Sequence, residues 1–356
     1  WTDSTLAVVA NAQRMTSPQI SSVIANYNGA RIVCDCIDSI LNQRGNIPFE
    51  IIVHDDASTD ESLTLLRTRY GHFTSPRVEI VESRENVGFC IANNRMAAMA
   101  RGEYLLFLNN DAALAPDALE TLLAAAHQQT PQGILTLPQI DWESGALVDR
   151  GCLLDPFYNP VPNLDPERMD VGMVIGACLW IPRALWEKLG GFPAWFGSLA
   201  EDMFLCCHAR IAGHPVQVTR TSHYRHRQGA SFGGNRVQDQ RLSSTYRRRR
   251  LSERNKTFVM LLCSPPLRLC LTLPIHLALL GLEGILLAIL KRDMRLWREI
   301  YVNVFTSLFQ NVAVLRKERT RIQKNRRISA RDYGKGFCWV PRKLQMFIRY
   351  GIPDLR

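Results

Sequence analysis

The fold is decided by the stretch FEIIVHDDASTD, which occupies residues 49–60. Four of its first five residues are apolar and together have the length of a buried strand, and a polar turn follows directly. Similar runs occur at residues 20–25, 78–81 and 104–108, with helical stretches at 30–42, 89–100 and 116–127. Strands that alternate with helices in this way predict βαβ units, and hence an α/β fold with a mainly parallel sheet flanked by helices.

Polar side chains follow three of the predicted strands at the point where each strand ends. In open α/β sheets, ligands bind beyond the carboxyl ends of the strands, so we expect a site there. Ser58, with Glu61 three residues later, also fits a capping box that would open the next helix. The residues at the three strand ends are Asn26 and Asn28, then Asp55 and Asp56, then Asn109, Asn110 and Asp111.

The side-chain chemistry of these ends narrows the class of ligand. The sequence contains neither a G-x-G-x-x-G after the first strand nor a G-x-x-x-x-G-K-[ST], which argues against a dinucleotide dehydrogenase and a P-loop NTPase. Asp and Asn instead suit the polar edges of a nucleoside and a hard divalent cation. We therefore expect Mg²⁺ or Mn²⁺, which would neutralise a diphosphate.

The net charge of +10 is unevenly distributed along the 356 residues. Residues 1–240 carry a balance of −8, whereas residues 241–356 carry +18. A basic segment of this size predicts contact with nucleic acid or with an anionic membrane surface.

The ten cysteines and residues 1–18 indicate the cellular compartment in which the protein is expected to work. No C-x-x-C pair occurs, so we interpret the cysteines as mostly reduced core residues in a cytosolic setting. Residues 1–18 lack an apolar run after a basic start, so no secretory signal is expected within them.

The basic third combines charge with an apolar segment. Four arginines stand at 247–250, and residues 269–290 are mostly apolar but interrupted by Pro274, His276 and Glu283. The segment is long enough to span a bilayer, yet these interruptions favour a helical hairpin or an interfacial helix. Basic residues at 316–331 are typical of anchoring on anionic cytoplasmic lipid. The alternatives are a soluble helical subdomain with a solvated basic face, and a nucleic-acid binder, for which no reader motif is present.

Six motifs in a fixed order resemble those of family 2 glycosyltransferases of the GT-A fold, in the rhamnosyltransferase-like branch. The resemblance covers about residues 20–260 and is far more specific than any one motif. The motifs are VIANYNG at 23–29, EIIVHDDASTD at 50–60, NVGF at 86–89, GEYLLFLNND at 102–111, GGF at 190–192 and ED at 201–202.

The resemblance implies an inverting, metal-dependent enzyme. It would move a sugar, rhamnose among the options, from a nucleotide-diphosphate sugar onto a glycan or lipid-linked acceptor in cell-surface polysaccharide synthesis. Its place would be the cytoplasmic face of the inner (plasma) membrane, peripheral or monotopic, without nucleic acid as a partner. The implied organisation is a lead-in at 1–18, a GT-A domain at 19–257 and a membrane-associated helical region at 258–356.

On the donor side, the resemblance implies that Asp55 binds the base of the nucleotide-sugar and that Asp111 is the main metal ligand, with Asn109 in place of the first aspartate of a D-x-D. His226, in a motif that continues through Gly229, Ala230 and Ser231, would be a further metal ligand or a diphosphate contact, and His223 competes with it. Asp55 and Asp56 could instead be turn residues that initiate a helix, and His226 a solvated loop residue. The other residues implied to line the nucleotide-sugar pocket are Asn26, Asn28, Asp56, Arg84, Asn86, Gly88, Asn109 and Asn110.

On the acceptor side, Asp202, beside Glu201, would be the catalytic base, and a helix N-terminus favours its ionised form. The pair could also be a simple acidic helix cap. Trp195, just before the pair, is the aromatic residue we expect to contact the acceptor. Phe204 and His208 stand where the family commonly has an aspartate and an arginine, which leaves the acceptor open. An Arg-Asn pair at 254–255 resembles the one that closes the family's catalytic region.

Two rival functions remain. The chain could be a non-catalytic scaffold that binds nucleotide-sugars on the same fold, or a basic nucleic-acid-binding protein. A substitution of the proposed catalytic base, Asp202, that abolishes sugar transfer but leaves nucleotide binding intact would exclude the non-catalytic scaffold.

Overall fold

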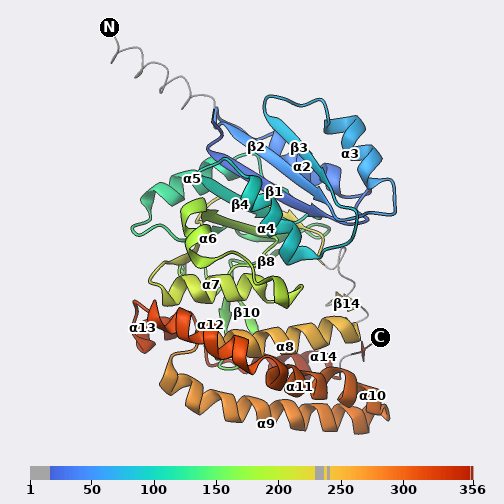
Figure 1. The fold of residues 1–356 in the computed structure, drawn as a ribbon, viewed down its shortest axis with the longest axis vertical. Coiled ribbons are helices and arrows are strands. Elements are labelled where there is room, and N and C mark those ends of the chain that lie inside the picture. Colours follow the sequence, from blue (N-terminus) through green and yellow to red (C-terminus); the bar gives the residue numbers. More distant parts are fainter. Residues whose placement is uncertain (1–16, 229–235, 239–240, 353, 356) are drawn as a thin grey trace.

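The structure, a computed structural model, describes residues 17–228, 236–238, 241–352 and 354–355. Its centre is a seven-stranded sheet with the order β12-β6-β11-β4-β1-β2-β3 (Figure 1). Four of the six neighbouring pairs are parallel, so the mainly parallel sheet is confirmed; β11 runs antiparallel to both of its neighbours. The strands are β1 (Ile20–Asn26), β2 (Phe49–Asp55), β3 (Arg77–Glu82), β4 (Tyr104–Leu108), β6 (Ile134–Thr136), β11 (Cys178–Pro182) and β12 (Val216–Val218).

Helices cover both faces of this sheet because successive side chains of a strand point to opposite faces. On one face, Ile24 and Leu106 pack with α2 (Val33–Leu41), α3 (Ser62–Tyr70) and α5 (Ala118–Gln128). On the other, Val23 and Phe107 pack with α4 (Phe89–Met99), α6 (Arg183–Leu189) and α7 (Glu201–Ile211). Between α6 and α7 lies a short 3₁₀ turn, η1 (Ala194–Phe196).

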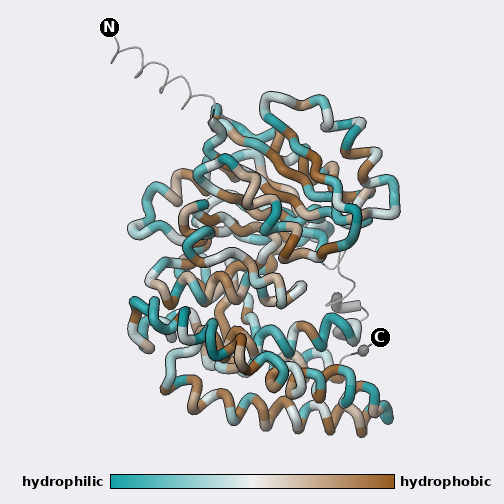
Figure 2. Tube along the Cα trace, in the orientation of Figure 1, coloured by the Kyte–Doolittle hydropathy of each residue, from teal (hydrophilic) through white to brown (hydrophobic). Residues whose placement is uncertain are grey.

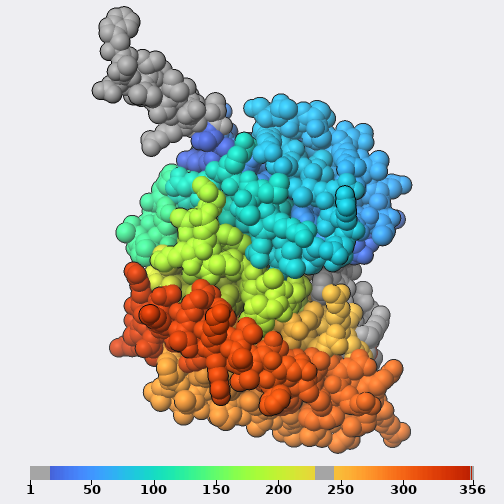
Figure 3. Space-filling view, in the orientation of Figure 1, coloured from blue at the N-terminus to red at the C-terminus, as the bar shows by residue number. Residues whose placement is uncertain are grey.

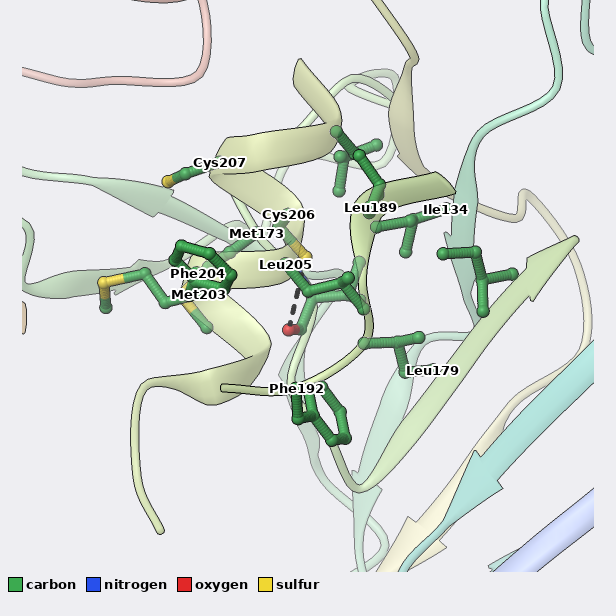
Figure 4. Close-up of a cluster of buried hydrophobic side chains, with 14 of the residues drawn as sticks. Ile134, Met173, Leu179, Leu189, Phe192, Met203, Phe204, Leu205, Cys206 and Cys207 are labelled. Carbon is green, nitrogen blue, oxygen red and sulfur yellow. Dashed lines mark hydrogen bonds between the residues drawn. The ribbon is translucent and has the colours of Figure 1, made fainter. Parts of the chain in front are cut away.

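Helix α7 carries two adjacent cysteines, Cys206 and Cys207, in its packed region. Figure 4 shows Leu205 of this helix among Leu179, Leu189 and Phe192, with Cys206 and Cys207 on different sides of the helix. Both cysteines are buried, as the core interpretation predicts.

Short strands that periodicity does not reveal form additional sheets. One has the order β5-β13-β7-β8 and is built from β5 (Ala112–Leu114), β13 (Tyr224–His226), β7 (Gln139–Asp141) and β8 (Leu147–Asp149). Its pairing sets His226 opposite Ala112, next to Asp111. The others are β9 (Cys152–Leu154) with β10 (Pro160–Pro162), and β14 (Arg236–Gln238) with β15 (Arg241–Ser244) and β16 (Asp354–Leu355).

The C-terminal residues form a helical layer at the end of the molecule away from β3 (Figures 1 and 3). Its first helix, α8, spans the boundary expected at residue 257 and packs against α7 and α12. The turn η2 is π-helical. The elements are α8 (Tyr246–Cys263), α9 (Pro266–Lys291), α10 (Met294–Leu296), η2 (Trp297–Val302), α11 (Asn303–Gln310), α12 (Val312–Lys324), α13 (Ala330–Gly334) and α14 (Arg342–Tyr350).

The apolar segment is one continuous helix, α9, which continues through Pro274. Because the helix is not broken at Pro274, the hairpin alternative is wrong. The part of the helix beyond the proline is held on the protein, since His276 Nε2 lies 2.8 Å from the Thr257 hydroxyl and Leu280 is buried. Within the described residues, α9 is the one helix long and apolar enough to cross a membrane.

A partly buried ionic cluster fastens α9 and α14 to α8. Glu253 of α8 forms ion pairs with Lys256 and Lys343, with N···O distances of 2.6 and 2.8 Å, and Lys343 also pairs with Glu283 of α9. Burial alone would raise the pKa of Glu253, but Lys256, Lys343 and Arg249 hold that pKa well below its usual value. Removing one partner of such a cluster leaves an uncompensated buried charge, so the cluster keeps the helices in register.

Two glycines of α9 give a matched test of this packing. A Cβ on Gly284 would lie 2.4 Å from the Tyr301 ring, whereas a Cβ on Gly281 would meet Phe305 at an ordinary 3.9 Å. We predict that Gly284→Ala lowers the free energy of unfolding by about 1–3 kcal/mol through overpacking. Gly281→Ala should instead be neutral or stabilising by up to about 1 kcal/mol, since alanine favours the helix. Urea unfolding of both variants checks this, and equal effects would contradict the packing described.

Candidate functional site

The carboxyl ends of β1, β2 and β4 are tied together by one side-chain amide. Asn26 Nδ2 donates to Asp55 Oδ2 at 2.9 Å, and Asn26 Oδ1 accepts from Asn110 Nδ2 at 2.8 Å. All three side chains are buried. A Cβ at Gly29 would lie 2.2 Å from Asn26 Oδ1, so this position requires glycine. Three predicted site residues from distant parts of the chain thus meet.

Ser58 belongs to this network and does not cap a helix. Its hydroxyl donates to Asp55 Oδ2 at 2.7 Å and accepts from the Asn28 N–H at 2.9 Å. Helix α3 begins only at Ser62, so the predicted capping box is wrong. The Asp55 carboxylate, and the Asn28 N–H from a distant part of the chain, take the hydroxyl that the local pattern assigned to the helix. Asn28 Oδ1 in turn accepts from the Thr59 N–H at 2.7 Å.

Asp56 organises the loop before α4. Its carboxylate accepts from the backbone N–H groups of Val87 and Gly88, at 2.8 and 2.9 Å. Gly88 has φ +82°, which favours glycine where this loop turns into the helix. Arg84 and Asn86 lie on the same loop and are exposed. The loop is thus fixed at Asp56 and presents these two side chains to solvent.

Asp111 and His226 come together from two different strands. Nε2 of His226 lies 3.1 Å from Asp111 Oδ1, and both side chains are buried. The Arg227 N–H donates to the Asp111 backbone carbonyl at 2.9 Å. Of the two histidines considered, His226 is therefore the one in contact with Asp111. Gly229, Ala230 and Ser231 of its motif lie outside the described residues.

The donor set at this point fits a divalent cation. Within the described residues no three His, Cys, Asp or Glu side chains converge, so the protein would offer Asp111 and His226. Nδ1 of His226 is buried and has no hydrogen-bond partner among the residues that the structure describes. Mg²⁺ and Mn²⁺ sites that serve phosphates are commonly built from one or two protein groups with phosphate and water oxygens. Asn109, the third member of this turn, donates its N–H to the Ala177 carbonyl at 3.1 Å.

The acidic pair opens α7, as predicted, and approaches the Asn109 turn through a neighbouring loop. Asp202 Oδ2 accepts from the Gly176 N–H at 2.9 Å, and Gly176 precedes the residue that bonds Asn109. Burial raises the pKa of Asp202, while the N–H groups of Gly176 and Met203 oppose this rise. The Gly176 N–H thus holds Asp202 on the side that faces the turn of Asn109 and Asp111.

Glu201 sits deeper than its neighbour. One of its carboxylate oxygens is buried and has no hydrogen-bond partner among the described residues. Burial, and then the charge of Asp202, raise the pKa of Glu201 to about 8, against the positive charge of Arg248. Glu201 therefore holds its proton more tightly than an exposed glutamate, which leaves Asp202 as the carboxylate of the pair better suited to accept a proton.

The Arg-Asn pair of α8 holds the loop that precedes the acidic pair. Nδ2 of Asn255 lies 3.1, 2.9 and 2.7 Å from the carbonyl oxygens of Phe196, Ser198 and Leu199. Arg254 also donates to the Phe196 carbonyl, at 2.8 Å. Leu199 and Ala200 have φ of +72° and +63°, a region that costs a non-glycine residue free energy. These contacts sustain the strained turn from which Asp202 projects.

Trp195 lies in the same loop and is partly buried. Its ring packs against Phe196 and Phe258, with centroids 4.8 and 5.2 Å apart. The two departures from the family pattern, Phe204 and His208, are buried in α7, and burial lowers the pKa of His208 to about 4. Both therefore belong to the packing of α7.

Two features of the site were not found from the sequence. Arg227 stacks on Trp142 at 3.5 Å and pairs with Asp35 of α2 at 2.6 Å. Asp149 is buried near His226, and burial raises its pKa to about 7. Arg227 directly follows β13 and Asp149 ends β8, and three-residue strands such as these leave no periodic signal in the sequence.

The sequence profile of the family described as Glycosyl transferase family 2 matches residues 21–189. The chain is 36% identical over 190 residues to the chondroitin synthase of Escherichia coli, covering 53% of this chain and 26% of that protein. It is 36% identical over 211 residues to the poly(ribitol-phosphate) beta-glucosyltransferase of Bacillus spizizenii, covering 58% and 32%. Overall, the aligned part spans between 18% and 32% of the first four curated relatives.

The fold also resembles that of solved structures. The crystal structure of GalNAc-T7 with UDP, GalNAc and Mn²⁺ superposes with a TM-score of 0.54 at 16% identity, over 69% of this chain and 48% of that one. The GT-A fold is therefore confirmed.

The raised pKa of Glu201 gives a pH-dependent prediction. Folded Glu201 holds its proton to about pH 8, whereas the unfolded side chain loses it near 4.5, so this group favours folding at low pH and that contribution is lost as pH rises through 8. Glu201→Gln has no proton to lose, so its stability relative to the wild type should increase from pH 5 to pH 9. Urea unfolding at several pH values measures this. Glu187→Gln, on the exposed side of α6, is the control, and parallel pH curves for wild type and Glu201→Gln would contradict the burial described.

Proposed function

We propose that the protein is an inverting, metal-dependent glycosyltransferase, because the profile of Glycosyl transferase family 2 matches residues 21–189. It transfers a sugar from a nucleotide-diphosphate sugar to a hydroxyl of a glycan or lipid-linked acceptor in polysaccharide synthesis. Rhamnose enters as a candidate donor through the resemblance of the motifs only.

One observation carries this proposal: the strand-end network, the Asp111–His226 pair and Asp202 lie around connected loops. Asn26 and Asp55 are joined by a hydrogen bond at 2.9 Å, and Asn110 of the same network directly precedes Asp111. Asp202 is tied to the other side of this turn through Gly176. The site therefore offers side chains of suitable chemistry for the edge of a nucleoside, for a diphosphate with its cation, and for the hydroxyl of an acceptor.

The donor is assigned to the polar strand ends. Asp55 and Asn28 supply hydrogen-bonding groups for the base, and Arg84 and Asn86 stand on the exposed loop where phosphate or sugar would meet them. Asp111 and His226 would hold the divalent cation, which supplies charge neutralisation at the leaving diphosphate. GalNAc-T7, whose fold is similar, was crystallised with UDP and Mn²⁺, which supports this assignment.

In this proposal Asp202 is the base that deprotonates the acceptor hydroxyl. Its carboxylate takes the proton of the acceptor hydroxyl while the oxygen bonds to the anomeric carbon and the carbon–diphosphate bond breaks, so the anomeric configuration inverts. A positioned base of this kind contributes roughly 10²–10⁴-fold to the rate. The raised pKa of Glu201 favours the negative charge on Asp202, and Asn255 keeps the turn before Asp202 in place.

We place the reaction at the cytoplasmic face of the inner membrane. The +18 balance of residues 241–356 suits anionic lipid. Two relatives are named for the synthesis of chondroitin and for glucosylation of poly(ribitol-phosphate), which supports a polymeric acceptor.

Donor binding can be tested without knowledge of the acceptor. Uridine, guanosine and thymidine diphosphate sugars are screened for thermal stabilisation with and without Mn²⁺. A ligand at 100 times its Kd should add about 2.7 kcal/mol to the free energy of unfolding. Asp111→Asn should remove the Mn²⁺-dependent part, while Asp165→Asn, on a distant loop, should keep it. Equal stabilisation of both variants would contradict the metal assignment.

The base is tested by Asp202→Asn with the donor found in that screen. The variant should bind the nucleotide-sugar as the wild type does but transfer at a rate lower by about 10²–10⁴-fold. Transfer is measured as release of nucleoside diphosphate that depends on acceptor. A wild type that binds donor but transfers to none of a panel of glycan and lipid-linked acceptors would favour the scaffold alternative, and unchanged transfer by the variant would exclude Asp202 as base.

A further inference from the structure

Helix α9 exposes a face with no polar side chain. Thirteen of its residues between 266 and 290 are exposed, and every one is apolar. They recur at spacings of one, three and four residues, which places them on a single face about 37 Å long. The residues are Pro266, Leu267, Cys270, Leu271, Pro274, Ile275, Ala278, Leu279, Leu282, Ile285, Leu286, Ile289 and Leu290. A surface helix of a soluble domain normally shows the reverse arrangement.

The opposite face of α9 carries its polar groups and binds the protein. Glu283 pairs with Arg249 and with Lys343, and accepts from the Tyr301 hydroxyl at 3.1 Å. His276 contacts Thr257, and at the helix start Arg268 stacks on Phe337 at 3.7 Å. The helix is therefore fastened to the body at its start and middle, and it lies along the end of the molecule (Figures 1 and 2).

Helix α14 repeats this outward arrangement. Its apolar residues Leu344, Phe347 and Ile348 are all exposed, and Trp339, just before it, is 91% exposed. Spacings of three and four place the first three on one face. The Lys343–Glu283 ion pair joins the first turn of this helix to the middle of α9. Two neighbouring helices thus direct apolar faces away from the protein.

The charge around these faces decides between possible occupants. Among residues 266–352, all described by the structure, thirteen exposed side chains are Lys or Arg and one, Glu299, is acidic. A second copy of the chain in a symmetric dimer would bring two such basic regions together, which is unfavourable. An anionic bilayer offers both an apolar layer and negative headgroups.

We propose that the exposed faces of α9 and α14 form one docking surface for an anionic lipid bilayer. In this surface α9 lies parallel to the membrane at the boundary of headgroups and acyl chains, and does not cross it. A crossing would place Glu283, His276 and their partners in the acyl layer or break the ion pairs that hold them. The inference specifies the membrane placement proposed above and is independent of the catalytic proposal.

Vesicle binding by the full chain tests the surface. The wild type should sediment with vesicles of phosphatidylglycerol and phosphatidylcholine and much less with phosphatidylcholine alone. Leu271, Leu279 and Leu286 are 63%, 46% and 49% exposed, so changing all three to Glu should preserve the fold but weaken binding about 100-fold or more. The control changes Met99, Leu147 and Leu164 to Glu; these are 38%, 42% and 59% exposed elsewhere, so the charge change is the same.

Several results would overturn the proposal. They are a wild type that does not bind anionic vesicles, equal loss in both triple variants, and a lipid-free dimer that the α9 variant abolishes, which would assign the face to a second copy. Circular dichroism of each variant confirms that the fold is kept. No nucleotide-sugar is present in the assay, so an inactive enzyme does not affect its result.

The orientation of α9 is tested with fluorescent labels on its exposed face. Cys270 is the one exposed cysteine among the described residues, and Ala278→Cys or Ile289→Cys with Cys270→Ser moves the label along the same face. Quenching by lipids brominated at shallow or deep positions measures the depth of each label in bound protein. Equal, shallow depths at all three positions are expected. A label at 278 that lies deeper than those at 270 and 289 would show a spanning helix and overturn the parallel orientation.

Discussion

The hydrogen bonds of the Asn26 side chain are the interaction on which the site depends. One amide joins β2 through Asp55 and the end of β4 through Asn110, so three strand ends are fixed relative to one another. The same turn carries Asp111 toward His226. Because these groups are buried, an unpaired member would cost about 1–3 kcal/mol, and the network therefore favours a single geometry.

Helix α8 connects this site to the C-terminal layer. Arg254 and Asn255 bind the turn before Asp202, while Glu253 and Lys256, their immediate neighbours, belong to the ionic cluster with Glu283 and Lys343. Four consecutive residues of a helix point in different directions, so one helix serves both regions. The loop that positions the proposed base and the helix proposed to dock on lipid thus share a rigid support.

Much of the site was predictable because it follows strands of strong pattern. The buried runs at β1, β2 and β4 identify their own ends, and Asn26, Asp55 and Asn110 stand at those ends. Ser58 was misassigned because a local capping pattern gives no information on the tertiary contact with Asn28 or on the competing hydrogen bond to Asp55. The contact of His226 with Asp111, the strained turn at Leu199 and Ala200 and the role of Asn255 depend on three-residue strands and on loop contacts, which leave no periodic signal.

The sequence alone determined the α/β fold, the polar strand ends, the acidic pair and the basic, apolar C-terminal third, because each is a local pattern of residue types. Only the tertiary structure decided which histidine meets Asp111, how deeply Glu201 is buried and which face of α9 is outward. Those outcomes depend on the packing of elements that are distant along the chain. The charge of the C-terminal third suggested a membrane, but the inward position of Glu283 is what leaves an entirely apolar face exposed.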